Sequence, residues 1–423
     1  MDLIEKLKQR SVIDNLTSKD LSNIVNKEKI TFYVGFDPTA DSLHVGQLAV
    51  INLIKLLQAK GHKAIILLGG ATSQVGDPGG KDKERKLLDK ETTDTNLSSI
   101  NTQIKKLLKK NKDEYIILNN SDWLSHWPYL DFLRDVGKHF SVNQMITRES
   151  VKRRIEREDI GISYTEFSYM LIQAYDFYHL YKKHKCSLQI GGSDQWGNIV
   201  SGVDYIRRKE QKTAYGMTFP LLTKADGTKF GKSEAGTIWL DPKKTSPFEF
   251  YQFFLRTEDE SVIKYLNTLT TIDEKEITEL NESLKKEAHL RKAQKKLATY
   301  LTEVVHGSEE LEKVNKASQV IYGGNMEGLD DETISQIFKD VSHSDFNMNI
   351  LENEGWSLLN ALIHTKIAPS RGQARKLINS GGIYINNKQQ SDHEYKLSTK
   401  DLASKSYLVL RKGKKHYFLV KII

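Results

Sequence analysis

The stretch from Thr31 to Gln58, TFYVGFDPTADSLHVGQLAVINLIKLLQ, decides the fold that we expect for the chain. It begins with the apolar run Phe32–Phe36, which predicts a buried strand that ends before Pro38. Beyond a polar turn, apolar side chains recur at the spacing of one helical face: Val50, Leu53, Ile54 and Leu57. The pattern therefore predicts a buried strand that leads into a helix through a polar turn.

The turn between this strand and helix has the composition of an anion site. Asp41 and Ser42 are favourable N-cap residues, and His44 and Gly46 follow at the expected helix start. The first backbone N–H groups of a helix have no partners and the helix dipole points at them, so an anion can bind there. Gly46 would let a flat ligand reach the backbone, and His44 offers a donor to a phosphate. A capping turn with a surface histidine is the alternative.

Length and composition bound the class of protein. The chain has 423 residues, 38% hydrophobic and 28% charged, which is typical of a globular protein with several domains. The single cysteine, Cys186, excludes internal disulfides and fits a reducing cytosol. The N-terminal residues 1–14 have the pattern of an amphipathic helix, and no stretch approaches the roughly 18 apolar residues of a membrane span. We expect a cytoplasmic protein.

The positive charge is concentrated near the C-terminus. The net charge is +8, and residues 356–423 carry 13 Lys/Arg against 3 Asp/Glu. The rest of the chain carries 50 against 52. This asymmetry indicates a nucleic-acid-binding module in the last part of the chain.

Further apolar runs predict an open parallel sheet. The runs suit strands buried on both faces, and they lie at 63–70, 115–118, 186–190 and 216–222. Polar, glycine-rich loops follow three of them: 76–81, 191–198 and 224–233. Each loop could be an ordinary surface turn, but open α/β sheets also bind ligands in the loops that follow their strands.

A predicted helix from Phe167 to Leu180 carries a polar stripe. Tyr169, Gln173 and Asp176 are spaced so that they share one face, while the remaining residues are almost all apolar. Polar groups on a largely buried helix need partners, which are either protein groups or a ligand.

The organisation of the rest of the chain follows from composition. Residues 121–185 are expected to be mostly helical, and so are residues 247–322. The polar segment 323–352, with scattered apolar residues, is predicted to be a linker, and 353–423 a small α+β module. The basic cluster Lys152, Arg153 and Arg154 is either a solvated face or an RNA contact, and the pattern leaves both open.

The motifs and their order resemble those of class I aminoacyl-tRNA synthetases. Leu43–Gln47 is similar to the HIGH signature of that class, and Lys229–Ser233 is similar to its KMSKS signature. The longer strings Tyr33–Thr39, Gln189–Asn198 and Lys224–Lys229 resemble bacterial tyrosyl-tRNA synthetases. The likeness extends over nearly the whole chain, and the C-terminal module resembles an RNA-binding domain of a small-subunit ribosomal protein.

The resemblance implies an α/β fold with a Rossmann-like parallel-sheet catalytic domain and a helical insertion. The implied parts are a catalytic domain at 1–246 with the insertion at 121–185, an α-helical anticodon-binding domain at 247–322, a linker at 323–352 and a basic RNA-binding domain at 353–423. The implied partners are tyrosine, ATP with Mg²⁺, the tRNA for tyrosine and a second copy of the chain, with no metal held tightly by the protein.

The implied reaction joins tyrosine to its tRNA in two steps. Tyrosine and ATP give tyrosyl-adenylate and pyrophosphate, and the tyrosyl group then passes to the terminal ribose of the tRNA with release of AMP. The carboxylate of the substrate is the nucleophile, so catalysis depends on positioning and on charges aimed at the phosphates.

The resemblance also implies roles for individual residues. The residues expected to act on the phosphates are Thr39, His44, Lys81, Arg85, Lys229, Lys232 and Ser233. Tyrosine is expected to bind to Tyr33, Asp37, Asp77, Tyr169, Gln173, Asp176 and Gln195, of which Tyr33 and Asp176 would read the phenol. The remaining contacts to ATP are expected from Gly46, Gln47, Gly192, Asp194 and Lys232. Contacts to tRNA are expected from Lys152, Arg153, Arg154, Arg371, Arg375 and Lys376.

The motifs depart from the class signatures in two places. The HIGH-like motif ends in Gln47, which keeps a hydrogen-bond donor but does not titrate. The KMSKS-like motif has Phe230 and Gly231 at its second and third positions but keeps both lysines.

Two other functions remain to be weighed. A tryptophanyl enzyme would share the fold, but Tyr33, Asp176 and the basic C-terminal module favour tyrosine. An RNA-binding protein built on an inactive synthetase would not need His44, Asp194 and the two lysines of the KMSKS-like motif, all of which are present.

Overall fold

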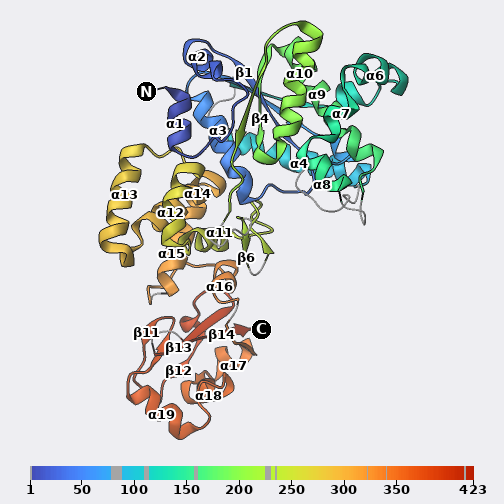
Figure 1. Cartoon of the computed structure of the whole chain (residues 1–423). Helices are drawn as coiled ribbons and strands as arrows, with labels where there is room; N and C mark the ends of the chain where they lie inside the picture. Colours follow the sequence, from blue (N-terminus) through green and yellow to red (C-terminus); the bar gives the residue numbers. More distant parts are fainter. Residues whose placement is uncertain are drawn as a thin grey trace. The chain divides into compact units, whose positions relative to one another are not determined.

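The computed structural model describes residues 2–77, 88–108, 114–156, 161–223, 230–233, 236–321, 323–339, 341–413 and 416–423. The chain divides into two compact units, each of which is described by itself. Unit 1 comprises Met1–Lys244 and Arg256–Leu297, and unit 2 comprises Thr245–Leu255 and Ala298–Ile423 (Figure 1).

A five-stranded parallel sheet forms the centre of unit 1. Its strands are β1 (Thr31–Phe36), β2 (Lys63–Leu68), β3 (Tyr115–Asn119), β4 (Cys186–Gly192) and β5 (Tyr215–Phe219), in the order β3-β2-β1-β4-β5. The chain moves outward from β1 in both directions, so its connections diverge between β1 and β4. Open sheets bind ligands at such a point, and the predicted Rossmann-like α/β fold is confirmed.

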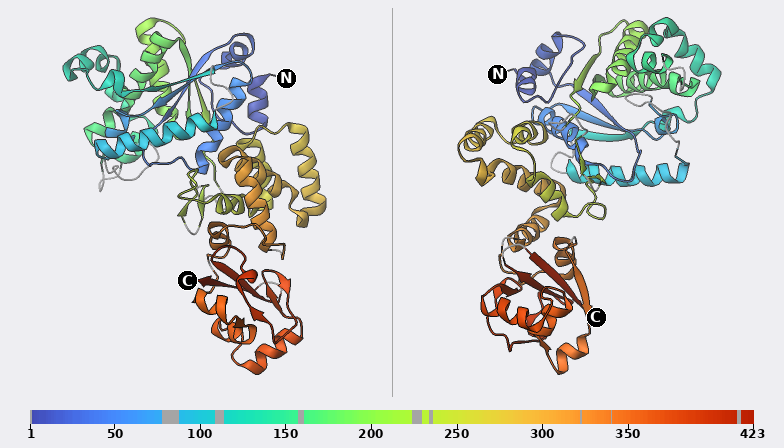
Figure 2. Two further views of the ribbon diagram at one scale, coloured as in Figure 1. Left: turned by 180° about the vertical axis from the view of Figure 1, so that it is seen from behind. Right: turned by 60° about the horizontal axis from the view of Figure 1, so that its bottom comes forward.

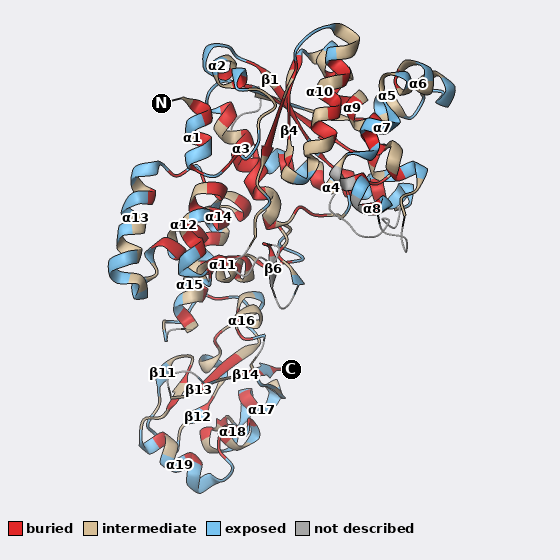
Figure 3. Cartoon of the chain, in the orientation of Figure 1, coloured by how far each residue is buried: buried red, intermediate tan, exposed pale blue. Residues whose placement is uncertain are grey.

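Helices cover both faces of this sheet. The main ones are α3 (Leu48–Gln58), α4 (Lys90–Leu107), α9 (Tyr164–His184) and α10 (Trp196–Glu210). On one face, Tyr33, Ile65 and Leu67 pack with Phe177 of α9 and Ile206 of α10. Figure 2 shows α4 on the opposite side of the sheet from α9 and α10. Because both faces are covered there, β1 and β2 are almost uniformly buried (Figure 3), and this is why they read as continuous apolar runs. The prediction that residues 115–118 form a strand buried on both faces is wrong, because β3 is an edge strand and none of its residues is buried.

Short helices fill the rest of unit 1. Two precede the sheet, α1 (Leu3–Gln9) and α2 (Asp20–Lys27). Between β3 and α9 lie α5 (Ser121–Leu124), α6 (Tyr129–Asp135), α7 (Val142–Ile146) and α8 (Glu149–Ile155), so the region predicted as a helical insertion is helical. After the sheet come β6 (Lys232–Ser233), β7 (Gly236–Thr237), α12 (Asp259–Leu269), α13 (Glu274–Glu287) and the start of α14 (Lys292–His306).

Unit 2 contains a second sheet with helices around it. The strands are β8 (His343–Phe346), β10 (Ile383–Ile385), β11 (Lys388–Gln389), β13 (Tyr407–Lys412) and β14 (His416–Ile422), in the order β11-β10-β13-β14-β8. A separate pair joins β9 (Trp356–Ser357) to β12 (Lys396–Leu397). The helices are α11 (Pro247–Leu255), α15 (Ser308–Ile321), α16 (Asp331–Ile337), α17 (Met348–Asn353), α18 (Leu358–His364) and α19 (Arg371–Asn379).

The predicted linker at 323–352 is wrong, because this segment belongs to the core of unit 2. It contains α16, β8 and α17, and β8 pairs in parallel with β14. The scattered apolar residues Leu329, Ile334 and Phe338 are buried together with Val409 and Leu419. These partners lie some seventy or more positions further along the chain, so the local pattern could not reveal them.

Residues 247–322, predicted as one helical domain, are shared between the two units. The C-terminal end of α12 is bound within unit 1, where the Arg10 guanidinium donates to the carbonyls of Asn267, Thr270 and Ile272. In unit 2, by contrast, α11 and α15 pack together. Within the part of the chain that is described, no helix has both the length and the apolar character needed to span a membrane.

Candidate active site

The carboxyl edge of the unit 1 sheet brings the predicted loops together. Asp37 follows β1 directly, and the 3₁₀ turn η5 (Ser193–Gln195) follows the neighbouring strand β4. On the other side of β1, β2 runs into Gly69, Gly70 and the 3₁₀ turn η2 (Thr72–Gln74). Residues that lie far apart in the sequence therefore meet at one edge.

Asp37 is held by hydrogen bonds on both carboxylate oxygens. The Thr72 hydroxyl donates to Oδ1 at 3.1 Å, and the Tyr169 hydroxyl donates to Oδ2 at 3.3 Å. A Cβ atom at position 69 would lie 2.1 Å from Asp37 Oδ1, so the close approach of this carboxylate requires Gly69. The structure thus unites the predicted Asp37 and Tyr169, and it adds Thr72, which the sequence did not single out.

Asp176 is a buried carboxylate with two donors. It is 1% exposed and accepts from Asn120 Nδ2 at 2.9 Å and from Trp123 Nε1 at 2.8 Å. Burial raises the pKa of Asp176 to about 7, against the opposing effect of these two hydrogen bonds. Asn120 also donates to the Thr72 hydroxyl at 3.0 Å, so a chain of hydrogen bonds connects Asp176 to Asp37.

Three buried side-chain oxygen atoms near Asp176 lack hydrogen-bond partners among the described residues. They are the Tyr33 hydroxyl, Gln173 Oε1 and Gln189 Oε1. Tyr33 is 2% exposed, and its pKa is raised by burial and by the negative charge of Asp176. Gln173 precedes Asp176 by three residues on α9, and Gln189 lies opposite Tyr33 in the pairing of β1 with β4. Buried polar groups normally have partners, so this cluster is suited to a polar ligand.

Asp77 and Gln195 meet as a second polar cluster at the same edge. Gln195 Nε2 donates to Asp77 Oδ2 at 2.5 Å, and Asn198 Nδ2 lies 3.4 Å from Asp77 Oδ1. Asn198 also donates to Gln195 Oε1 at 3.2 Å. Sequence reasoning found Asp77 and Gln195 but gave no role to Asn198, although it lies in the quoted string Gln189–Asn198.

The turn before α3 is capped by His44 and not, as predicted, by Asp41 or Ser42. The 3₁₀ turn η1 (Val45–Gln47) opens the helix, with the Gly46 N–H donating to His44 Nδ1 at 3.0 Å. The His44 N–H donates to Gln47 Oε1 at 2.7 Å, so the two side chains form a capping box. Asp41 forms an ion pair with Lys244 instead.

The protonation of His44 follows from this geometry. Burial lowers the pKa of His44, which favours the neutral imidazole. Because Nδ1 accepts a hydrogen bond from Gly46, the proton resides on Nε2, which can donate to a ligand. Gln47 uses its oxygen in the cap, which leaves its amide group as the remaining donor.

The other predicted ATP contacts lie along the same edge. Thr39 is exposed in the turn after β1, and its N–H donates to the Asp37 carbonyl at 2.9 Å. Gly192 ends β4, and Asp194 is exposed in η5 just beyond it. A Cβ at position 192 would lie 2.5 Å from Asp194 Oδ1, so glycine permits this turn.

The segment that follows the KMSKS-like motif lies against the HIGH-like turn. The Val45 N–H donates to the Ile238 carbonyl at 3.0 Å, and the Ile238 N–H donates to the Gly231 carbonyl at 2.9 Å. Lys81, Arg85 and Lys229 lie outside the described residues. Lys232 and Ser233 are placed by their backbone only, in β6.

The structure contradicts the prediction that Arg154 contacts tRNA. Its side chain is 2% exposed, pairs with Glu166 at 2.9 Å and donates to the Gly161 carbonyl at 2.8 Å. A guanidinium that is buried and paired in this way holds the insertion together and is not available to RNA. Of its neighbours, Lys152 is exposed, and the side chain of Arg153 lies outside the described part.

The predicted contacts in the C-terminal module are on the surface of unit 2. Arg371, Arg375 and Lys376 are exposed on α19, while Ala374 and Ile378 of the same helix are buried. The helix therefore presents its basic residues to solvent and its apolar side to the core.

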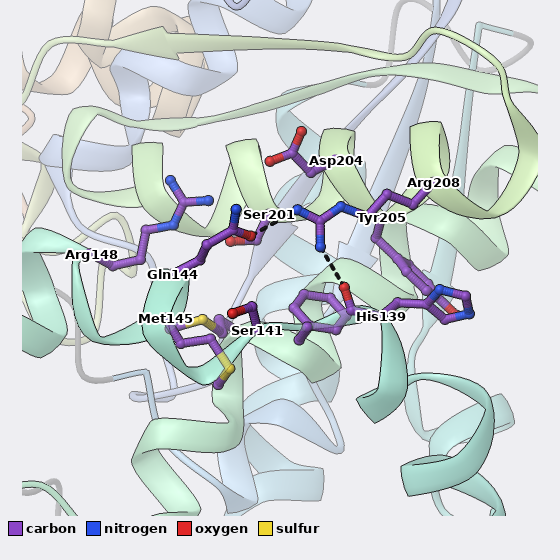
Figure 4. Close-up of a pocket in the computed structure, with 11 residues that line it drawn as sticks. His139, Ser141, Gln144, Met145, Arg148, Ser201, Asp204, Tyr205 and Arg208 are labelled. Carbon is purple, nitrogen blue, oxygen red and sulfur yellow. Dashed lines mark hydrogen bonds between the residues drawn. The ribbon is translucent and has the colours of Figure 1, made fainter.

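A small cavity in the helical insertion is separate from this edge. Figure 4 shows it between α7 and α10, where Arg208 donates to the His139 carbonyl and to Gln144 Oε1, both at 2.7 Å. Its volume of about 20 Å³ has room for a water molecule but not for an amino acid or a nucleotide. Among the predicted site residues that the structure describes, none lines this cavity.

Comparisons with known proteins agree with the geometry. A family model described as class I tRNA synthetases (W and Y) matches residues 25–323, and one described as the tyrosine–tRNA ligase C-terminal domain matches residues 333–420. The chain is 44% identical to a tyrosine–tRNA ligase of Roseiflexus castenholzii, with 100% of this chain and 99% of the relative covered. It is 45% identical to tyrosine–tRNA ligase 1 of Bacillus subtilis, with 99% of each covered.

A solved structure gives the same result. The C-terminally truncated mitochondrial tyrosyl-tRNA synthetase of Aspergillus nidulans is similar with a TM-score of 0.68 at 33% identity, over 75% of this chain and 93% of that one. The first family model includes tryptophan and tyrosine enzymes, and the second selects tyrosine. The chain belongs to the tyrosine–tRNA ligases, the class I aminoacyl-tRNA synthetases that join tyrosine to its tRNA.

Proposed function

We propose that the carboxyl edge of the unit 1 sheet is where this ligase activates tyrosine, with the phenol of the substrate between Tyr33 and Asp176. The observation that carries this assignment is the Tyr33 hydroxyl, which has no hydrogen-bond partner in the described part of the chain, near a buried carboxylate that is fixed by Asn120 and Trp123. A phenol can donate to Asp176 and accept from Tyr33 at the same time. Phenylalanine would leave both groups unpaired, which costs free energy in a buried site.

We assign the amino-acid end of the substrate to Asp77 and Gln195 of the second cluster together with Tyr169 and Gln173 of α9. Asp77, Tyr169 and Gln173 hold the ammonium group in this proposal, and Gln195 lies near the carboxyl group. The carboxylate of Asp77 supplies the negative charge that an ammonium group needs, and Gln195 already orients it through a hydrogen bond of 2.5 Å. Asp37, fixed on both oxygens, is placed to serve both the amino acid and the ribose.

ATP occupies the region where the HIGH-like turn and η5 lie. His44 donates from Nε2 to a phosphate, with Thr39 beside it, and Asp194 binds the ribose hydroxyls. Gly46 and Gly192 let the nucleotide approach the backbone, and the amide of Gln47 is a further donor. Lys81, Arg85, Lys229, Lys232 and Ser233 are assigned to the pyrophosphate by their match to the family motifs.

The two steps then need no protein nucleophile. A carboxylate oxygen of tyrosine forms a bond to the α-phosphorus, and the bond from that phosphorus to the bridging oxygen of pyrophosphate breaks. In the second step a ribose hydroxyl of tRNA attacks the tyrosyl carbonyl carbon, and AMP leaves. The residues at the edge position the reactants and stabilise negative charge. Mg²⁺ would accompany ATP, held by the phosphates more than by the protein, and would offset their negative charge.

Replacing Asp176 with Asn tests the assignment of the phenol site. Asparagine presents an amide group to one of the donors, Asn120 or Trp123, and removes the charged acceptor. We expect tyrosine affinity to fall by roughly 10- to 100-fold, as for loss of a hydrogen bond to a charged group, with ATP binding retained. Equilibrium binding of each substrate measures both quantities. Unchanged tyrosine affinity would show that the phenol is read elsewhere.

The tRNA contacts are assigned to Arg371, Arg375 and Lys376 of α19, with Lys152 and Arg153 of α8. The exposure of the three α19 residues on the basic C-terminal module supports this assignment, and Lys152 of α8 is also exposed. The triple change of the α19 residues to alanine should lower tRNA charging and flatten its dependence on salt, while adenylate formation stays at the parent rate. If tRNA charging depends on salt equally in the parent and the variant, α19 does not contact tRNA.

We also propose that the ligase is a cytoplasmic homodimer joined through the helical insertion. Exposed apolar residues gather there, with Leu130 75%, Tyr129 59% and Tyr164 61% exposed, and the hydroxyls of the two tyrosines lie 3.1 Å apart. Burying such residues against a second copy would be favourable. Light scattering should give twice the mass of one chain, and Leu130→Asp should halve it. A monomeric parent protein would exclude this interface.

A further inference from the structure

One tyrosine touches both ends of the segment that carries the first lysine of the KMSKS-like motif. The Tyr265 hydroxyl, from α12, donates to the Thr223 carbonyl at 3.2 Å. The ring of Tyr265 lies 4.5 Å from the ring of Phe230, measured between centroids. Thr223 and Phe230 flank residues 224–229, and both aromatic rings are buried.

The two ends are also bound to each other and to the HIGH-like turn. The Phe230 N–H donates to the Leu222 carbonyl at 3.1 Å. Gly231 follows with φ +87, and a Cβ there would lie 2.9 Å from Val45 Cγ2, so this position requires glycine. The backbone that leaves Phe230 is therefore packed directly beside the turn that carries His44.

Helix α12 is in turn anchored to α3, the helix that follows the turn of His44. Asn52 of α3 donates from Nδ2 to the Thr268 carbonyl at 2.8 Å, and Arg10 of α1 donates to three carbonyls at the same end of α12. These bonds satisfy carbonyls that a helix C-terminus leaves without partners. The bonds between α3 and α12 thus connect the turn of His44, which leads into α3, with Tyr265 of α12.

We propose that Tyr265 is a positioning residue for the pyrophosphate-binding lysines. By fixing Thr223 and Phe230 against α12, it sets the position of the backbone at Phe230 and Gly231, which leads directly into Lys232 beside the turn that carries His44. Tyr265 contacts no substrate in this proposal. The inference rests on the proposed role of Lys229 and Lys232 at the pyrophosphate, and it adds a residue to which neither motif points.

Tyr265→Phe tests the role of the hydroxyl, because it keeps the ring against Phe230 and removes the bond to Thr223. We expect the rate of adenylate formation to fall by roughly threefold to tenfold, as for loss of one hydrogen bond expressed in the transition state. Pyrophosphate should also bind more weakly in the reverse reaction. The affinity for tyrosine should stay at the parent value, since the phenol site does not involve α12.

Tyr205→Phe is the matched control. Tyr205 is also a buried tyrosine of unit 1, and its hydroxyl donates to the Asp135 carbonyl at 3.3 Å, in the helical insertion. The control should form adenylate at the parent rate. A second variant, Phe230→Leu, removes the ring contact from the other partner and should reproduce the defect of Tyr265→Phe, with tyrosine affinity again unchanged.

Three outcomes would overturn the proposal. Tyr265→Phe could form adenylate as fast as the parent, it could lose tyrosine affinity in proportion to the rate, or it could be no slower than Tyr205→Phe. Measuring the parent first keeps the two proposals separate, because tyrosine-dependent exchange of pyrophosphate into ATP by the parent supports the proposed function whatever Tyr265→Phe does. Melting temperatures of all variants, measured alongside, show whether each one is folded.

Discussion

At the scale of single residues, the proposed phenol site consists of two buried polar groups, the carboxylate of Asp176 and the hydroxyl of Tyr33. Asp176 has both oxygens engaged by neutral donors and still has a pKa of about 7, because burial outweighs those bonds. Tyr33 has no hydrogen-bond partner among the described residues. In the proposed function, the phenol of tyrosine is the partner that completes these two groups.

The raised pKa of Asp176 predicts how tyrosine binding depends on pH. Above pH 7 the carboxylate is ionised and is the stronger acceptor for the phenol. Below pH 7 the carboxyl group of unliganded Asp176 is protonated, and tyrosine must displace that proton when it binds. The affinity for tyrosine should therefore fall by up to about tenfold per pH unit. Calorimetric titrations in two buffers at pH 6.5 would detect the released proton. In Asp176→Asn this dependence should be absent, and a parent protein whose affinity is flat between pH 6 and 8 would contradict the assignment.

Arg154 is predicted to matter for stability and not for RNA recognition. Changing Arg154 to Met leaves Glu166 as a buried carboxylate without its partner, and the expected loss is about 3–5 kcal/mol in the free energy of unfolding. Adding Glu166→Leu should restore much of it. Lys152→Ala, on the exposed face of the same helix, should cost about 1 kcal/mol or less. Denaturant unfolding compares the three, and an Arg154 variant of parental stability would refute the structural role.

Among the elements, those with strong local patterns were predicted and those that depend on distant partners were not. The buried strands β1, β2 and β4 read as apolar runs, and α3 read as an apolar helical face. The cap of α3 was missed because His44 forms it through Nδ1 with Gln47 as its partner, a pairing outside the usual Ser, Thr, Asp and Asn caps. The sequence did not point to Asn120 and Trp123, because they lie more than fifty positions from Asp176 and bind it only in the folded chain.

The buried residues of the segment 323–352 are predicted to stabilise unit 2. Ile334 is fully buried in the core that α16 shares with β13 and β14, so Ile334→Ala should lower the stability of unit 2 by about 2–5 kcal/mol. Ile350→Ala, in the same segment but 43% exposed, should have little effect. Hydrogen exchange at the β14 amides reports on this unit directly. Equal exchange in both variants would mean that the segment is a linker after all.

For the whole molecule, sequence reasoning gave the order of the parts but not their boundaries. The helical region after the sheet is divided because Arg10 and Asn52 bind α12 to unit 1, whereas Gln252 of α11 donates to Ser318 of α15 at 3.2 Å within unit 2. Local composition predicts that a segment is helical, but it does not predict which other elements the helix packs against. The resemblance predicted the family and the fold of the catalytic part correctly, because a family match constrains the whole chain at once, but the boundaries of 247–322 and 323–352 drawn with it do not match the two units.

The central claim is that one sheet edge holds ATP beside a pocket that reads a phenol. Amino-acid-dependent exchange of labelled pyrophosphate into ATP, measured with each of the twenty amino acids and no tRNA, tests it most directly. We predict rapid exchange with tyrosine and, by comparison, negligible exchange with phenylalanine and tryptophan. Exchange with phenylalanine or tryptophan at a rate close to that with tyrosine would contradict the account.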